Sequence, residues 1–178
     1  RLRMDTSQVI INEERPQLTK HLATRFKEKI GQNVNLLGEV VLGNEEADHR
    51  YHHYLEALES PDINYISVKI SGIYAQTHAL NYEESFPELV SRMSALYQKA
   101  IDFPYTDEDG IKRSKFINLD MEEYKDAHFT LRLFKAVLNL PQFKNYSAGI
   151  VVQAYLPDAY DFQTELLEFA KARVDGGG

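Results

Sequence analysis

Four polar or charged residues stand near the carboxyl ends of four apolar segments of the sequence. They are Glu39, Lys69, Asp120 and Gln153. Lys69 lies inside the apolar segment SVKIS, where an ammonium group without a partner would cost several kcal/mol or lose its proton. We therefore expect an anion beside Lys69, and Asp120 or Glu39 could supply it. This pairing could be a structural ion pair, or it could belong to a functional site.

Asp120 also has a purely structural interpretation. A carboxylate just after a strand is often the N-cap of the next helix, where it accepts hydrogen bonds from backbone N–H groups. In the segment KFINLDMEEY, Glu122 and Glu123 are expected to begin that helix, because negative charge is favourable at a helix amino end. At this point both interpretations of Asp120 stay open.

The segments that carry these residues alternate between two periodicities. Short runs rich in β-branched residues predict strands, and runs with apolar residues at helical spacing predict helices. The predicted strands are residues 34–41, 64–71, 115–120 and 148–156, and the predicted helices are residues 15–30, 44–60, 82–101, 124–140 and 160–174. The polar segment 102–114 is predicted to be an exposed loop.

Alternating strands and helices with short connections predict an α/β fold with parallel strands. Two architectures fit, an open doubly wound sheet and a (βα)8 barrel of the TIM type, of which four βα units would be half. The segment GEVVLGN does not match the G-x-G-x-x-G pattern that binds dinucleotide phosphates, which favours the barrel. In a barrel, Glu39, Lys69, Asp120 and Gln153 would meet at the mouth where the carboxyl ends of the strands converge.

Composition argues against several functional classes. The 178 residues include no Cys, which excludes disulfides, thiolate metal sites and Cys nucleophiles and suits a reducing compartment such as the cytoplasm. A formal net charge of -7 without a basic cluster argues against a nucleic-acid partner. No apolar run approaches the roughly 20 residues of a membrane-spanning helix.

Three histidines, His49, His52 and His53, lie close together in the segment HRYHH. His49 and His53 have the i, i+4 spacing of a metal-binding pair on a helix. Tyr51 and Tyr54 lie on the expected buried face of that helix, however, which turns the histidines towards solvent. No metal site is therefore predicted.

Four segments, which include the residues discussed above, resemble the proline dehydrogenase family in their order and spacing. The resemblance includes the proline dehydrogenase domain of the bifunctional bacterial proline-utilisation enzymes. The segments are NLLGEVVLGNEEADHRYHHYLEAL, YISVKISGIYAQ, INLDMEEYKD and AGIVVQAYLPD, and the resemblance covers about residues 34–175. It implies a (βα)8 barrel with noncovalent FAD at its mouth. It also implies oxidation of L-proline to 1-pyrroline-5-carboxylate, with electrons passed to a membrane quinone and hence peripheral contact with a membrane.

The resemblance implies roles for individual residues. Lys69 would face the proline carboxylate near the flavin, and Glu39 would stand beside the substrate as the counter-charge to an arginine. The catalytic residues implied in this way are Lys69, Asp120 and Glu39. The flavin neighbours implied are Asp120, Met121, Gln153 and Tyr155.

This sequence departs from the family pattern in two respects. The family usually has Asp where this chain has Asn35, four residues before Glu39. The family's next strand, of the type RLVKGA, brings an arginine to the flavin and would begin just past Gly178, and a later helix carries the arginines that grip the proline carboxylate. We therefore expect residues 1–33 to be a leading helical segment and residues 34–178 the first half of the barrel, which alone would neither oxidise proline nor hold FAD tightly.

Two other functions stay open from the sequence. A barrel aldolase could use Lys69 to form a Schiff base with a carbonyl substrate. The chain could also be a noncatalytic folding or interaction segment of a longer protein.

Overall fold

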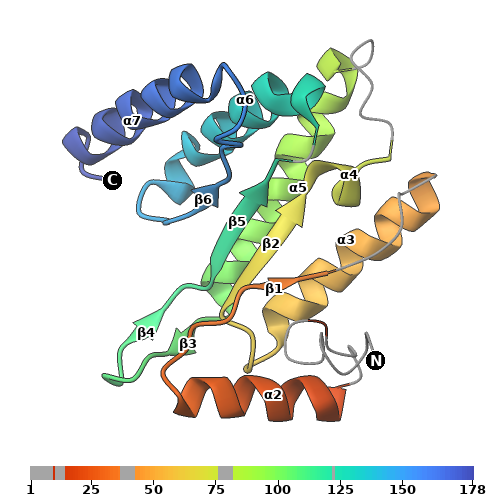
Figure 1. Ribbon diagram of the computed structural model, residues 1–178, viewed down its shortest axis with the longest axis vertical. Helices are drawn as coiled ribbons and strands as arrows, with labels where there is room; N and C mark the ends of the chain where they lie inside the picture. Colours follow the sequence, from red (N-terminus) through yellow and green to blue (C-terminus); the bar gives the residue numbers. More distant parts are fainter. Residues whose placement is uncertain (1–9, 11–14, 37–42, 76–81, 122) are drawn as a thin grey trace.

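The computed structural model describes residues 10, 15–36, 43–75, 82–121 and 123–178, and a four-stranded sheet lies at its centre. Neighbouring strands are parallel, in the order β1, β2, β5, β6. The strands are β1 (Val34–Asn35), β2 (Tyr65–Lys69), β5 (Phe116–Asp120) and β6 (Gly149–Ile150). Helices separate consecutive strands along the chain (Figure 1), which confirms the α/β prediction.

The longer helices occupy the segments predicted to be helical. They are α2 (Arg15–Lys27), α3 (Asn44–Glu59), α5 (Tyr82–Asp102), α6 (Ala127–Leu138) and α7 (Ala159–Asp175). The 3-10 turn η2 (Tyr124–Asp126) falls at the start of the helix predicted over 124–140, whereas the periodicity predicts neither α4 (Ile70–Ile73) nor η3 (Pro141–Phe143). One turn of helix carries too few residues to show a period, which explains why these elements were missed.

The last predicted strand is shorter than expected. Residues 148–156 were predicted to be extended, but β6 ends at Ile150, and only the amide of Val151 continues the pairing, by donating to the Leu119 carbonyl over 3.0 Å. The chain then turns, with the amide of Leu156 donating to the Gln153 carbonyl over 3.1 Å. Most of the first predicted strand, residues 37–41, lies outside the described residues.

The polar segment 102–114 is more ordered than a simple exposed loop. It contains the antiparallel hairpin of β3 (Tyr105–Thr106) and β4 (Lys112–Arg113). The carboxylate of Asp107 accepts hydrogen bonds from the amides of Asp109 and Ile111, and it pairs with Arg113. Gly110 supplies the positive φ of 77° that the turn requires.

Side chains alternate between the two faces of the sheet. One face of β2 and β5 is apolar and packs against α3, α5 and α6 in a single core. Its strand residues are Ile66, Val68, Ile117 and Leu119, all of them buried. Since α5 lies behind β2 and β5 (Figure 1) and contacts β5, this is the outer, helix-covered face.

The opposite face of the sheet is mostly polar and consists of three rows that run across the strands. The lower row pairs Tyr65 with Phe116, whose rings meet edge to face at 5.0 Å. The middle row comprises Asn35, Ser67, Asn118 and Gly149, one residue from each strand. The upper row pairs Lys69 with Asp120 at the carboxyl ends of β2 and β5.

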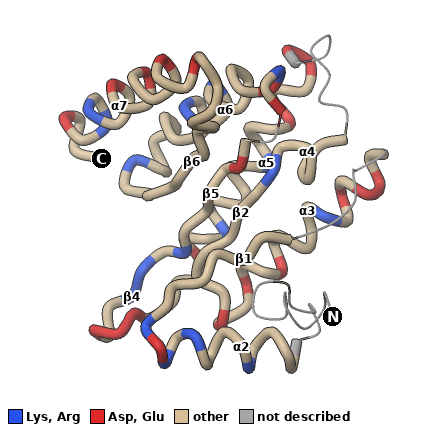
Figure 2. Tube along the Cα trace, in the orientation of Figure 1, with Lys and Arg blue, Asp and Glu red and all other residues tan. Residues whose placement is uncertain are grey.

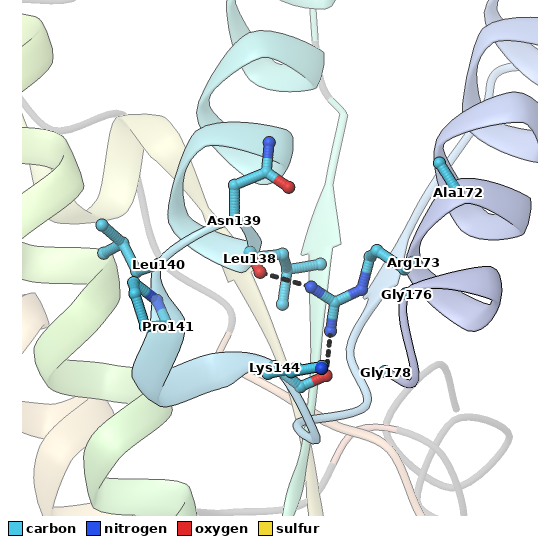
Figure 3. A pocket seen from close by; sticks show the side chains of 9 residues that line it. All are labelled: Leu138, Asn139, Leu140, Pro141, Lys144, Ala172, Arg173, Gly176 and Gly178. Carbon is cyan, nitrogen blue, oxygen red and sulfur yellow. Dashed lines mark hydrogen bonds between the residues drawn. The ribbon is translucent and has the colours of Figure 1, made fainter.

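Arg173 attaches α7 to the chain around η3 (Figure 3). Its guanidinium donates hydrogen bonds to four backbone carbonyl groups. Figure 3 shows those to Leu138 and Lys144, and the other two go to Phe143 and Tyr146. Leu138 is the last residue of α6, and the other three residues belong to η3 or follow it, so one planar cation satisfies acceptors that would otherwise need water.

Replacing Arg173 with Lys should therefore destabilise the protein. An ammonium group cannot reach four carbonyl groups in a fixed plane, and the loss of charge-assisted hydrogen bonds costs about 2–3 kcal/mol in the free energy of unfolding. The measurement is chemical denaturation. Lys171→Ala, at an exposed position on the same helix, should change stability by no more than about 0.5 kcal/mol. Equal effects of the two substitutions would contradict the anchoring role.

Lys115 is a buried cation at the amino end of β5. It is 1% exposed, and its ammonium donates to the carbonyl of Ser60. Burial lowers the pKa of Lys115 from 10.5 to about 8, although the nearby Asp62 carboxylate acts in the opposite direction. Between these two pH values the unfolded chain binds a proton that the folded chain lacks.

Because of this difference, Lys115 should make the free energy of unfolding increase as the pH rises above about 8. Lys115→Met removes this titration, so the slope of stability against pH between about 8 and 9.5 should be smaller in the variant. Denaturant unfolding at a series of pH values measures both slopes. Identical slopes in the two proteins would show that Lys115 keeps an ordinary pKa in the fold.

Candidate active site

The upper row brings together two of the residues singled out from the sequence. β2 and β5 are paired over their whole length, so Lys69 and Asp120 are register partners at the same edge of the sheet. Both side chains are half-buried. Lys69 is also the residue before α4, because β2 runs directly into that short helix. A cation and a carboxylate therefore stand side by side where two parallel strands end.

Amide groups hold the carboxylate of Asp120. Asn118, two residues earlier on β5, donates from Nδ2 to Oδ1 over 2.8 Å. Asn35 on β1 reaches past β2 and donates from Nδ2 to Oδ2 over 3.2 Å. Each carboxylate oxygen thus accepts one hydrogen bond from the middle row. The charge balance predicted between Asp120 and Lys69 stays a prediction.

The structure tests the helix-capping interpretation of Asp120. It is the last residue of β5, and η2 begins only at Tyr124, with Glu123 at its N-cap position. The following helix, α6, has Asp126 at its N-cap position. The helix-capping interpretation of Asp120 is therefore wrong. Glu122 lies outside the described residues.

Gln153 and Met121 lie next to each other beyond the upper row. Nε2 of Gln153 donates to the backbone carbonyl of Met121 over 3.3 Å. The Met121 side chain is buried in a small core cluster with Leu131 and Phe162. Met121 thus connects the carboxyl end of β5 to the apolar contacts between α6 and α7.

The remaining predicted site residues are less constrained. Tyr155 is 79% exposed in the turn that precedes α7, so its ring is open to solvent on the strand-end side of β6. Glu39 lies outside the described residues, and its role stays a prediction. Sequence reasoning missed Asn118 altogether and treated Asn35 only as a departure from a family pattern. The signal available in the sequence was the spacing Asn118-x-Asp120, which places both side chains on one face of a strand.

The three histidines of the segment HRYHH lie on α3. His49 and His53 lie with ring centroids 4.4 Å apart, and His52 hydrogen-bonds the carbonyl of Asp48. Across the part of the chain that the structure describes, no group of three His, Cys, Asp or Glu side chains could hold a metal ion. In the same part of the chain, no helix is both long and apolar enough to cross a membrane.

Outside the upper row, the described elements carry charges of both signs. Figure 2 shows charges of both signs on α3, α5 and α7, whereas α2 and α6 carry only Lys and Arg. Several of these charges pair locally, as Arg92 does with Asp48 and Glu88 at 2.6 and 2.8 Å. In the upper row, by contrast, Lys69 and Asp120 are register partners at the ends of two strands.

Parallel strands covered by helices on one face, with polar side chains on the other face and at the carboxyl ends, define a segment of a β/α barrel with a candidate site at the strand ends. The chain belongs to the proline dehydrogenase family, whose model matches residues 18–176. The match includes most of α2 as well as the sheet.

Solved structures agree with this assignment. Proline utilization A from Corynebacterium freiburgense is 38% identical, with a TM-score of 0.88 over 99% of this chain and 18% of that protein. Proline utilization A from Bdellovibrio bacteriovorus, solved after inactivation by N-propargylglycine, is 28% identical, with a TM-score of 0.72 over 87% of this chain and 18% of that protein. A search of curated proteins gave no match. The chain thus spans about a fifth of the length of the relatives it matches.

Gly149 of the middle row allows β6 to approach β5. A Cβ atom at this position would lie 2.6 Å from Oδ1 of Asn118 and 2.9 Å from a ring carbon of Phe116. Both distances are shorter than a van der Waals contact. Any side chain at position 149 would therefore displace Asn118, Phe116 or the strand itself.

Gly149→Ala should destabilise the protein by about 1–3 kcal/mol, because overpacking forces neighbouring side chains out of their preferred rotamers. Gly31→Ala is the matched control, since a Cβ atom there would meet nothing within 4 Å. Denaturant unfolding of both variants measures the difference. If Gly149→Ala were as stable as Gly31→Ala, the close approach of β6 would not constrain this position.

Proposed function

We propose that this chain forms part of a FAD-dependent proline dehydrogenase, which acts in proline catabolism by oxidising L-proline to 1-pyrroline-5-carboxylate. The observation that carries the proposal is the pair of Lys69 and Asp120 at adjoining strand ends in a chain of this family. Because the chain spans 18% of the length of the two solved relatives described above, the activity is proposed for the protein that contains the whole domain.

The residues at the strand ends fit a flavin. The polar edge of an isoalloxazine ring needs hydrogen-bonding groups, and its faces need apolar or aromatic contacts. Asp120 and the amide of Gln153 would supply the former, and the surroundings of Met121 and Tyr155 the latter. FAD, when bound, supplies the hydride acceptor for the ring carbon next to the proline nitrogen.

Lys69 would bind and orient the substrate. Its ammonium is half-buried at the end of β2, where attraction to the proline carboxylate is less screened than in bulk water. The same cation would stabilise negative charge that develops at the site during the reaction. Asp120 would keep Lys69 charged and correctly aimed, since a nearby carboxylate favours the protonated amine. Glu39 would balance a cation contributed by another part of the domain.

No covalent nucleophile is needed for this reaction. The task of the protein is to hold the donor carbon against the acceptor and to exclude water, both of which rigid strand ends can do. Family membership favours this chemistry over a Schiff-base aldolase, which would also use a lysine at a strand end. The electrons would pass to a membrane quinone, so we propose a cytoplasmic protein that contacts a membrane peripherally.

The decisive experiment compares two acidic residues in the full-length protein. Asp120→Ala should lower kcat/KM for proline by about 100-fold or more, the usual loss when one electrostatic contact is removed from an active site. Glu123→Ala should leave kcat/KM within about 3-fold, because Glu123 is exposed and pairs with Lys125. Proline-dependent reduction of the bound flavin and of a quinone analogue measures both.

Equal losses in the two variants would contradict the role of Asp120. If the wild-type protein held no flavin and reducing borohydride trapped a carbonyl compound on Lys69, the aldolase would replace the dehydrogenase. The 178-residue chain expressed alone provides a further comparison, and we expect it to bind FAD weakly and to show no proline-dependent dye reduction.

A further inference from the structure

The middle row of the sheet places two amides directly against the carboxylate of the upper row. Asn118 and Asn35 each donate one hydrogen bond, and they reach different oxygens of Asp120. They approach from different strands, β5 and β1, on either side of β2. A carboxylate held at both oxygens from two strands cannot rotate about its terminal torsion without losing one of these bonds.

We propose that Asn35 and Asn118 are positioning residues that fix the orientation of the Asp120 carboxylate beside Lys69, and that Gly149 is required because it leaves room for Asn118. The inference rests on the proposed function for its catalytic consequence. The hydrogen bonds on which it depends are features of the fold.

The choice of amides has a physical reason. Asp120 is half-buried and next to a cation, so its oxygens need donors, yet a second cation would compete with Lys69 for the carboxylate. An Asn side chain supplies an N–H donor without adding charge. The two amides therefore hold Asp120 without changing the balance of charge between Lys69 and Asp120.

Gly149 extends the arrangement to a third strand. It is the register partner of Asn118, and a Cβ atom there would come within 2.6 Å of Oδ1 of Asn118. The oxygen of the Asn118 amide therefore points towards β6 while its nitrogen donates to Asp120. The absence of a side chain at Gly149 therefore leaves room for the Asn118 amide in the orientation that donates to Asp120.

Asn33 offers a matched control. It lies two residues before Asn35, and its Nδ2 donates to the hydroxyl of Ser67 on β2 over 2.9 Å. The bond is of the same type and also joins β1 to β2, but it does not involve Asp120. Asn33→Ala therefore reports the effect of losing a side-chain bond between β1 and β2, without any effect on the position of the Asp120 carboxylate.

The experiment is a set of double-mutant cycles in the full-length, flavin-loaded protein. Asn35→Ala, Asn118→Ala and Asn33→Ala are each made in the wild-type and in the Asp120→Ala background. Two quantities are measured for every variant: the midpoint of thermal unfolding, and the steady-state parameters kcat and KM for proline. Coupling appears when the effect of one substitution depends on the presence of the other residue.

We expect Asn35→Ala and Asn118→Ala to lower kcat by about 10-fold or more, because a misplacement of about 1 Å can cost 100-fold. KM for proline should change by less than about 3-fold, since neither amide binds the substrate. Each substitution should also lower the unfolding midpoint by about 2–8 °C in the wild-type background. In the Asp120→Ala background both effects should largely disappear.

Asn33→Ala should lower the midpoint equally in both backgrounds and leave kcat unchanged. Effects of Asn35→Ala and Asn118→Ala that persist without Asp120 would overturn the inference, as would a rise in KM without a fall in kcat. Should the wild-type protein fail to oxidise proline, the proposed function would fall, whereas the unfolding midpoints would still decide whether the amides act through Asp120.

Discussion

The parallel register between β2 and β5 is the constraint on which the remaining structure depends. It pairs five residues of each strand and ends with Lys69 opposite Asp120. Because side chains alternate along a strand, this one alignment sets both faces of the sheet. A shift of β5 by one residue would turn Leu119 towards the polar face and Asp120 towards the helices. Neither the core nor the strand-end pair would survive that shift.

The register is maintained from both faces of the sheet. On the outer face, Ile66 and Ile117 are register partners and both are buried under the helices. On the opposite face, the rings of Tyr65 and Phe116 meet edge to face in the lower row. Aromatic pairs of this kind add to the stability that burial alone provides. The polar upper row can therefore be held in place by apolar contacts that take no part in its chemistry.

Periodicity in the sequence was sufficient to predict the long helices and the central strands, because burial of one face imposes a pattern on the residues themselves. It also predicted that Lys69 and Asp120 would lie together, which requires only that two parallel strands end at the same edge. The role of Asn35 could not be predicted in this way. Its contact with Asp120 depends on the order of three strands and on their registers, and no spacing within one segment encodes that.

The short elements were missed for a related reason. The hairpin in 102–114 depends on Asp107, whose carboxylate collects two backbone amides and Arg113. From composition alone such a segment resembles a solvated loop. Gly149 likewise could be interpreted only once Asn118 was known to lie opposite it. Contacts between residues far apart in the sequence carry this information, and local patterns do not.

The middle row also bears on what a strand-end site requires. Polar groups on a partly buried sheet face lose water, and they destabilise the fold unless each finds a partner. Here Asn33 satisfies Ser67, while Asn35 and Asn118 satisfy Asp120. The same bonds that offset the cost of burial also restrict the carboxylate to one orientation. Stability and preorganisation thus come from one set of contacts, so substitutions in this row should affect both together, unlike substitutions on the apolar face.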